Sequence, residues 1–190
     1  MGGGAAATRS RLNFTGDREL DIQQYAVTAT VGYVRPSRLS IRGSVGAIVD
    51  GRLEGGGRIH NIGPGVVMAA SVAKQWTRDP WFATASFGMA FSRTTTTEAG
   101  MRQSLIATDL ARVGVIAGRT LGAFSPYVLA RGFAGPVFWR LDDEDVGGSD
   151  THFFQLGLGA SVATRAGLSV VVDLALLGEQ SAALAVAMRL

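Results

Sequence analysis

The final stretch of the chain, Leu168–Leu190, alternates between large apolar and smaller side chains, and this constrains the fold more than any other feature. The positions between the large residues are mostly small and include one acid and one base, Asp173 and Arg189. A polar break at residues 178–181 divides the stretch in two. Alternation with a period of two is typical of β-strands, so the stretch predicts a hairpin of two antiparallel strands.

The two faces of this hairpin differ from those of a soluble sheet. In water, the face opposite the core normally carries charged and polar residues. Here that face is small and weakly charged, which suits the crowded interior of a barrel, whereas the continuous apolar face favours contact with lipid. Because hydrocarbon cannot satisfy the backbone of an open edge strand, strands cross a bilayer only in closed barrels. The sequence therefore predicts an all-β, up-and-down antiparallel transmembrane β-barrel.

Composition agrees with this fold and argues against other classes. The chain has 190 residues, a length typical of one domain, and 47% of them are hydrophobic against 17% charged. It nevertheless lacks an uninterrupted apolar run of about 18 residues, the length that a spanning helix needs. Cysteine is absent, so disulfides and thiol chemistry do not arise. The basic residues are dispersed along the chain, which argues against a nucleic-acid partner, and we expect no metal and no cofactor.

Further alternating segments predict the remaining strands. They lie at residues 9–16, 23–34, 38–49, 66–76, 81–91, 104–118, 127–139 and 154–162. With the terminal hairpin they give about ten strands, and eight is the alternative. We interpret residues 1–8 as a flexible N-terminal tail, so the barrel domain is expected to span residues 9–190. The strand register of residues 122–140 remains open.

Aromatic residues near the strand ends predict an interfacial girdle. Tyr25 and Tyr33 bracket an apolar stretch that, in a strand tilted by about 45°, covers roughly 20 Å of membrane depth. Trp76, Trp81 and Phe91 repeat the pattern on other strands. Aromatic side chains gather where a membrane meets water. An ordinary half-buried strand that happens to carry two tyrosines is the alternative interpretation of residues 23–34.

Five charged residues fall on the face that is expected to line the lumen: Arg42, Arg112, Arg131, Asp173 and Arg189. Charges inside a small barrel usually pair with one another and close the lumen, and we prefer this interpretation. The alternative is a narrow, arginine-lined pore that prefers anions. The many small residues on the same face leave room for water, so both interpretations stay open.

The connections between strands alternate in length. Short turns at 35–37, 77–80, 119–125 and 165–167 alternate with longer polar loops at 50–65, 93–102 and 141–150. In this alternation and in its terminal segment SAALAVAMRL, the chain resembles small bacterial outer-membrane β-barrel proteins, over essentially its whole length from Arg9. That family usually ends in Phe or Trp, whereas this chain ends in Leu190.

The resemblance implies a porin-like protein in the lipid bilayer of a Gram-negative outer membrane. It also implies that the C-terminal strand is presented to the outer-membrane assembly machinery, and it suggests contact with lipopolysaccharide. Residues 1–7 lack the basic and apolar regions of a secretory leader, so we expect the sequence to be a mature form without its signal peptide. The predicted function is a structural, interaction or narrow-pore role, and we expect that the protein is not an enzyme.

Two alternative functions remain. Asp150-Thr151-His152 resembles the Asp-x-His pair of omptin proteases, and a lipid or peptide hydrolase could act through His152 at the extracellular mouth. The second acidic pair of that family and a complete triad with Ser149 are not identifiable. A soluble β-barrel that binds an apolar ligand is the other alternative. The acidic segment 142–145 is interpreted as a solvated loop rather than a cation site.

Overall fold

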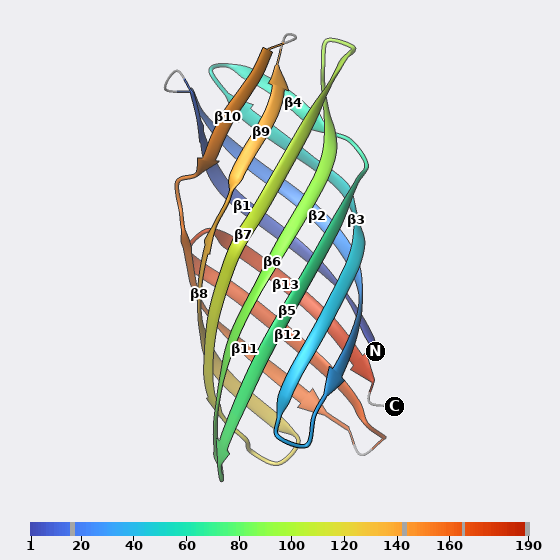
Figure 1. The fold of residues 1–190 in the computed structure, drawn as a ribbon, viewed down its shortest axis with the longest axis vertical. Coiled ribbons are helices and arrows are strands. Elements are labelled where there is room, and N and C mark those ends of the chain that lie inside the picture. The colour runs from blue at the N-terminus through green and yellow to red at the C-terminus, as the bar shows by residue number, and fades with distance from the viewer. Residues whose placement is uncertain (16–17, 142–143, 165, 189–190) are drawn as a thin grey trace.

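A computed structural model describes residues 1–15, 18–141, 144–164 and 166–188 and shows a closed, antiparallel β-barrel (Figure 1). Its thirteen strand segments are β1 (Gly2–Phe14), β2 (Arg18–Val34), β3 (Leu39–Gly55), β4 (Arg58–Ile62), β5 (Gly65–Arg78), β6 (Trp81–Glu98), β7 (Met101–Arg119), β8 (Phe124–Ala134), β9 (Pro136–Leu141), β10 (Glu144–Asp150), β11 (Phe154–Ala163), β12 (Leu168–Gly178) and β13 (Gln180–Met188). Within these described ranges, no helix is long and apolar enough to cross a membrane.

The thirteen segments exceed the ten predicted strands because three strands are interrupted. β4 and β5 follow one another along β3 and β6, and β8 and β9 follow one another along β7. β10 and β11 also follow one another, since β10 pairs with β9 and β11 pairs with β8. When each of these three pairs is counted once, ten antiparallel strands surround the barrel. The predicted all-β, antiparallel barrel is therefore confirmed.

The two halves of the barrel have different circumferences. In the half that contains Gly2 and the end of β13 at Met188, here called the terminal half, the ring is β1-β2-β3-β5-β6-β7-β8-β11-β12-β13, closed where β13 pairs with β1. In the opposite, distal half the ring is β1-β2-β3-β4-β6-β7-β9-β10, closed where β10 pairs with β1. The β12–β13 hairpin belongs only to the terminal half, so the ring narrows from ten strands to eight where that hairpin turns.

The N-terminal residues belong to the barrel wall, so the prediction of a tail at residues 1–8 is wrong in placing them outside it. Gly2–Arg9 pair with β13 on one side and with β2 on the other. A run of glycine and alanine carries no hydrophobic alternation, which is why no strand was predicted there. Close packing explains the composition: a Cβ at Gly2 would lie 2.6 Å from the carbonyl oxygen of Val186.

The three longer loops predicted from the sequence are largely strand. Residues 50–55 and 58–62 extend β3 and form β4, residues 93–98 and 101–102 belong to β6 and β7, and residues 144–150 form β10. Residues 142–143 of the acidic segment lie outside the described residues. Glycines and charges suggested loops, but these segments alternate between exposed and buried residues as well, and the buried positions include Leu53 and Ile62 together with the polar His60, Thr94 and Thr96.

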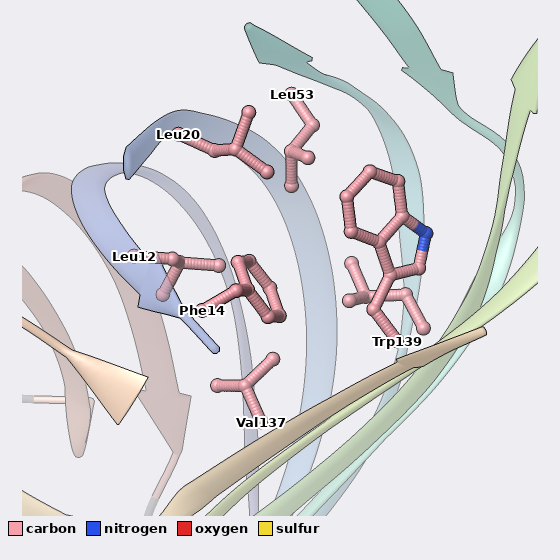
Figure 2. Close-up of a cluster of buried hydrophobic side chains, with 7 residues drawn as sticks. Leu12, Phe14, Leu20, Leu53, Val137 and Trp139 are labelled. Carbon is pink, nitrogen blue, oxygen red and sulfur yellow. The ribbon is translucent and has the colours of Figure 1, made fainter. Parts of the chain in front are cut away.

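The two halves of the barrel therefore differ in where their large apolar side chains lie: on the outer wall in the terminal half and in the interior in the distal half. In the terminal half large apolar side chains cover the outer wall, with Leu184, Val186 and Met188 between 42% and 51% exposed. In the distal half the large apolar side chains fill the interior, where Leu53 and Trp139 are 0% and 2% exposed (Figure 2). The soluble-barrel alternative is wrong for the terminal half, since its bulky faces point outward.

Two bulges change which residues face inward where the halves meet. On β3, Tyr25 pairs with Asp50 and Ala26 pairs with Ile48, so Val49 is the extra residue and the alternation shifts by one. The shift places Leu53 inside. On β7, Arg112 pairs with Gly88 and Asp109 pairs with Ala90. This second bulge turns Asp109 toward the interior, whereas uninterrupted alternation would have turned it outward.

Candidate functional site in the barrel lumen

A three-residue polar cluster lies in the lumen of the terminal half and spans one strand of its wall. Arg131 on β8 donates a hydrogen bond from Nη2 to Oδ2 of Asp173 on β12, at 2.6 Å. The hydroxyl of Tyr127, also on β8, donates to Oδ1 of the same carboxylate at 2.6 Å. β8 and β12 are not neighbours, because β11 lies between them. The structure thus brings together two predicted lumen residues, Arg131 and Asp173, with a tyrosine that the open register of 122–140 had left unassigned.

Gly159 on β11 makes this contact across a strand feasible. It pairs with Tyr127 on one side and with Asp173 on the other. A Cβ at this position would lie 2.2 Å from Cε2 of Tyr127 and 2.6 Å from Oδ1 of Asp173. The glycine leaves open the space through which the tyrosine hydroxyl reaches the carboxylate. Both oxygens of Asp173 are satisfied as a result, which is the condition under which a buried charge is stable.

A second polar cluster lies where the barrel narrows. The β7 bulge brings Asp109 to the inside, and its carboxylate is 3.7 Å from Nε of Arg112. The guanidinium of Arg112 lies over the ring of Phe133 on β8, 5.7 Å from its centroid. Arg112 was predicted to line the lumen, whereas the inward direction of Asp109 could not be predicted without knowledge of the bulge.

The β12–β13 turn adds a carboxylate to this narrowing. Glu179 accepts a hydrogen bond from Nε2 of the buried Gln155 at 2.6 Å. Burial, and to a smaller extent the nearby carboxylate of Asp150, raise the pKa of Glu179 to about 7, and Arg112 opposes the shift. Asp150 itself accepts hydrogen bonds from the Ser10 hydroxyl at 2.6 and 2.7 Å, and burial raises its pKa as well. Asp109, Asp150, Glu179 and Arg112 therefore influence one another where the barrel narrows.

His152 lies two residues after Asp150 in the chain and does not form a recognisable catalytic arrangement with it. Its backbone N–H donates to Oδ1 of Asp150 at 2.7 Å, and its ring Nδ1 lies 3.3 Å from the hydroxyl of Thr151. The Asp150 carboxylate thus contacts the backbone of His152, where a catalytic pair would orient the imidazole. Across the described ranges, no group of three or more His, Asp or Glu side chains could hold a metal ion.

The distal half is filled by an apolar cluster, here called the distal core, composed of Leu12, Phe14, Leu20, Leu53, Leu105, Val137 and Trp139 (Figure 2). Its residues come from β1, β2, β3, β7 and β9, so they meet across the interior rather than along one wall. Trp139 donates from its indole nitrogen to the Thr96 hydroxyl at 2.9 Å. The ring of His60 packs edge-on against Trp139, with centroids 4.8 Å apart. Of these residues only Leu53 lies in one of the three longer predicted loops; Leu12, Phe14, Leu105, Val137 and Trp139 lie in predicted strands, but their meeting in one core was not predicted.

The other predicted residues are spread over the wall. Arg42 lies on β3 and is exposed, with its Cγ close to Gly32 of β2. Arg189 lies outside the described residues. Tyr25, Tyr33, Trp76 and Trp81 are exposed side chains of the terminal half, and Phe91 is partly exposed. Tyr33, Trp76 and Trp81 lie near the end that carries the termini, and Tyr25 and Phe91 lie toward the narrowing.

A closed antiparallel barrel with bulky residues outside and small or paired polar residues inside is the fold of an outer-membrane β-barrel protein. Among solved structures, the chain is similar to the transport unit of the autotransporter AIDA-I from Escherichia coli, with 11% sequence identity and a TM-score of 0.50 over 100% of this chain and 90% of that chain. It is also similar to the beta domain of the Bordetella autotransporter Brka, with 13% identity and a TM-score of 0.47 over 98% of each chain.

At 11% identity, the likeness to the AIDA-I transport unit concerns the fold alone. No family model matches the sequence, and no curated protein matches it.

Proposed function

We propose that this protein is an integral barrel of the bacterial outer membrane that is closed to through-passage and has a structural or interaction role. The observation that carries the proposal is the distal core. Its side chains come from opposite walls, and Leu53, Leu105 and Trp139 are almost completely buried. Protein interiors packed in this way leave few voids larger than a water molecule, so an ion that entered the terminal half would meet a dry apolar barrier.

The outer wall supports the membrane assignment. Large apolar residues that are at least 40% exposed recur on neighbouring strands of the terminal half, including Val31, Val45, Val72, Phe87, Val115, Leu158, Leu174 and Leu184. A continuous apolar surface of this kind is unfavourable in water and is expected in lipid. The outer wall of the distal half instead carries ion pairs such as Arg11–Asp21 and Arg52–Glu54. The terminal half would therefore span the bilayer, and the distal half would project from it.

The direction of insertion follows from the chain ends. Bacterial barrels with an even number of strands keep both termini on the periplasmic side, which would place the distal half outside the cell. The charged distal wall is then the surface available for partners, including lipopolysaccharide. β13 pairs with β1 to close the terminal ring, so its assembly would depend on the machinery that inserts outer-membrane strands.

A narrow pore is the competing function, and the lumen charges argue against it. A selective pore needs charges that face water and stay free to meet ions. Arg131 is instead engaged by Asp173, and Arg112 lies between Asp109 and Phe133. These contacts neutralise Arg131 and offset part of the charge of Arg112, which leaves Arg42 as the exposed arginine among the predicted lumen residues that the structure describes.

Two measurements on refolded protein test the proposal. On a gel, protein refolded in detergent should migrate faster before boiling than after it, as closed membrane barrels do. Single-channel recording in planar bilayers should give no steady conductance. Conductance steps with anion preference would overturn the closed-barrel proposal in favour of the pore, and failure to insert into bilayers or detergent would overturn the membrane assignment.

A further inference from the structure

A groove of ≈ 760 Å³ lies at the edge of the terminal half that carries the short turns. One row of directly paired residues crosses it from β5 to β11: Trp76, Ala83, Ala117, Val128 and Leu158. Ala83 and Ala117 are too small to fill the outer wall between the tryptophan and the two aliphatic side chains. The row is therefore a trough with a floor of two alanines, and its volume falls within the usual range for small-molecule sites, about 300–1,000 Å³.

The next row toward the turns is cationic. Trp81 pairs with Arg78 on β5 and with Arg119 on β7, so it stands between two arginines on the outer wall. The guanidinium of Arg119 lies over its ring, 5.6 Å from the centroid. All three residues line the groove. An apolar trough that ends at an arginine–tryptophan–arginine row has the polarity of an amphiphile with an anionic head.

The surroundings provide few opposite charges. Within the described residues, the turns at this end carry Arg35, Arg38, Arg78 and Arg119 and a single acid, Asp79. Neither Arg78 nor Arg119 forms an ion pair with another described residue. In contrast, several arginines of the distal wall are matched by acids, as in Arg11–Asp21, Arg52–Glu54 and Arg58–Glu98. The positive charge at the groove thus remains available for an external anion.

We propose that this groove binds an anionic glycerophospholipid from the leaflet at the terminal end. One acyl chain lies over Ala83 and Ala117 between Trp76 and Val128, and the phosphate lies between Arg78 and Arg119. Guanidinium groups bind phosphate through paired, charge-assisted hydrogen bonds, and basic pockets at membrane surfaces select anionic headgroups. The inference rests on the proposed function, because the groove meets lipid only if the terminal half spans a bilayer.

Tryptophan fluorescence can report on this site directly. The chain has three tryptophans; Trp76 and Trp81 line the groove, whereas Trp139 is buried in the distal core. The protein would be refolded into phosphatidylcholine vesicles that contain a minor fraction of phosphatidylglycerol, with bromine on the acyl chains of one lipid at a time. Bromine quenches tryptophan on contact, so brominated phosphatidylglycerol should quench more than its mole fraction accounts for, with Trp139 as the unquenched background.

Three double variants separate the headgroup site from the trough. Arg78→Gln with Arg119→Gln should reduce the preference for phosphatidylglycerol by about tenfold, on the basis that each basic residue contributes modestly to anionic lipid binding. Arg35→Gln with Arg38→Gln removes the same charge from another turn of the same end and should leave most of the preference intact. Ala83→Leu with Ala117→Leu fills the trough and should reduce the preference while both arginines remain. Free glycerol phosphate should not compete.

The outcomes are distinguishable. Equal effects of the two arginine pairs would indicate diffuse surface charge and overturn the local site, as would the absence of any preference in the wild-type protein. Competition by glycerol phosphate would assign the arginines to a soluble anion instead. If neither brominated lipid quenches Trp76 and Trp81, the protein is not in the bilayer, and the proposed function fails with the site.

Discussion

The hydroxyl of Tyr127 and the carboxylate of Asp173 meet at 2.6 Å across β11, because the intervening residue is Gly159. The same carboxylate accepts the hydrogen bond of Arg131. The contact joins two strands that do not pair with one another, so it ties the barrel together across its wall as well as satisfying a buried charge. It also indicates which substitutions should weaken the terminal half.

Replacement of Asp173 by alanine should lower the free energy of unfolding by about 3 kcal/mol, since it leaves the guanidinium of Arg131 in the lumen without its counter-charge. The denaturant midpoint in lipid vesicles measures the change. The double variant Arg131→Met with Asp173→Leu removes both charges and should lose less stability than Asp173→Ala. If the double variant is the less stable of the two, the ion pair is not the reason for the loss.

Gly159→Ala tests the space that the glycine leaves between Tyr127 and Asp173, without changing any charge. A Cβ there would lie 2.2 Å from Cε2 of Tyr127, so the tyrosine must move and its hydrogen bond to Asp173 is lost. We expect a cost of about 1–3 kcal/mol, as for overpacking in other interiors. The same substitution in a Tyr127→Leu background should cost clearly less, which a double-mutant cycle measures. Additive costs would show that the glycine has another role.

Trp139→Ala should destabilise the protein by about 3–5 kcal/mol through the cavity that it leaves in the distal core. The indole is 2% exposed and also donates a hydrogen bond to Thr96. Trp139→Phe keeps most of the apolar volume and is the matched control. Limited proteolysis of intact and variant protein in detergent should show new cleavage sites in the distal strands of Trp139→Ala, and unchanged protection would contradict a packed distal core.

The raised pKa of Glu179 predicts that the stability of the fold depends on pH. It lies in the β12–β13 turn, outside the spanning strands, and its pKa is raised from 4.5 to about 7 by burial and by Asp150. The folded state therefore binds this proton more tightly than the unfolded state, and stability should fall as the pH rises from about 4.5 to about 7. Glu179→Gln should remove that part of the dependence and stabilise the protein above pH 7, by up to about 3 kcal/mol. Asp150 contributes in the same direction, so unfolding midpoints should be compared between the two variants Glu179→Gln and Asp150→Asn.

Insertion of one alanine after Val49 should prevent closure of the distal half. Val49 is already the extra residue of the β3 bulge, and a second extra residue would shift the alternation of the strand again. Leu53 would then face outward, and its charged neighbours Arg52 and Glu54 would enter the distal core. Loss of the fast-migrating gel form measures the effect, and Val49→Ala, which keeps the bulge, is the control. An insertion variant that still folds would show that the inward position of Leu53 is not required.

The sequence alone predicted the class of fold and most of the terminal half. Alternation in Gln23–Val34 and Leu168–Leu190 can be interpreted because a membrane barrel has only two environments, lipid outside and a narrow lumen inside. A period of two therefore assigns each residue of a regular strand to one of these two faces. Arg112, Arg131 and Asp173 were predicted to be lumen residues in this way. Tyr127 and Asp109, which contact them, were not among the predicted site residues, since the first lay in a segment of open register and the position of the second depends on a bulge.

The tertiary structure decided the remainder, because the missing information is not local. A glycine- and alanine-rich N-terminus becomes a strand only because β13 and β2 pair with it. Segments that carry both charges and glycines become the distal half because Leu53, Leu105 and Trp139 meet across the interior from strands far apart in the chain. Alternation determines that two faces exist; which face meets lipid and which meets a core depends on the bulges and on where the barrel leaves the membrane.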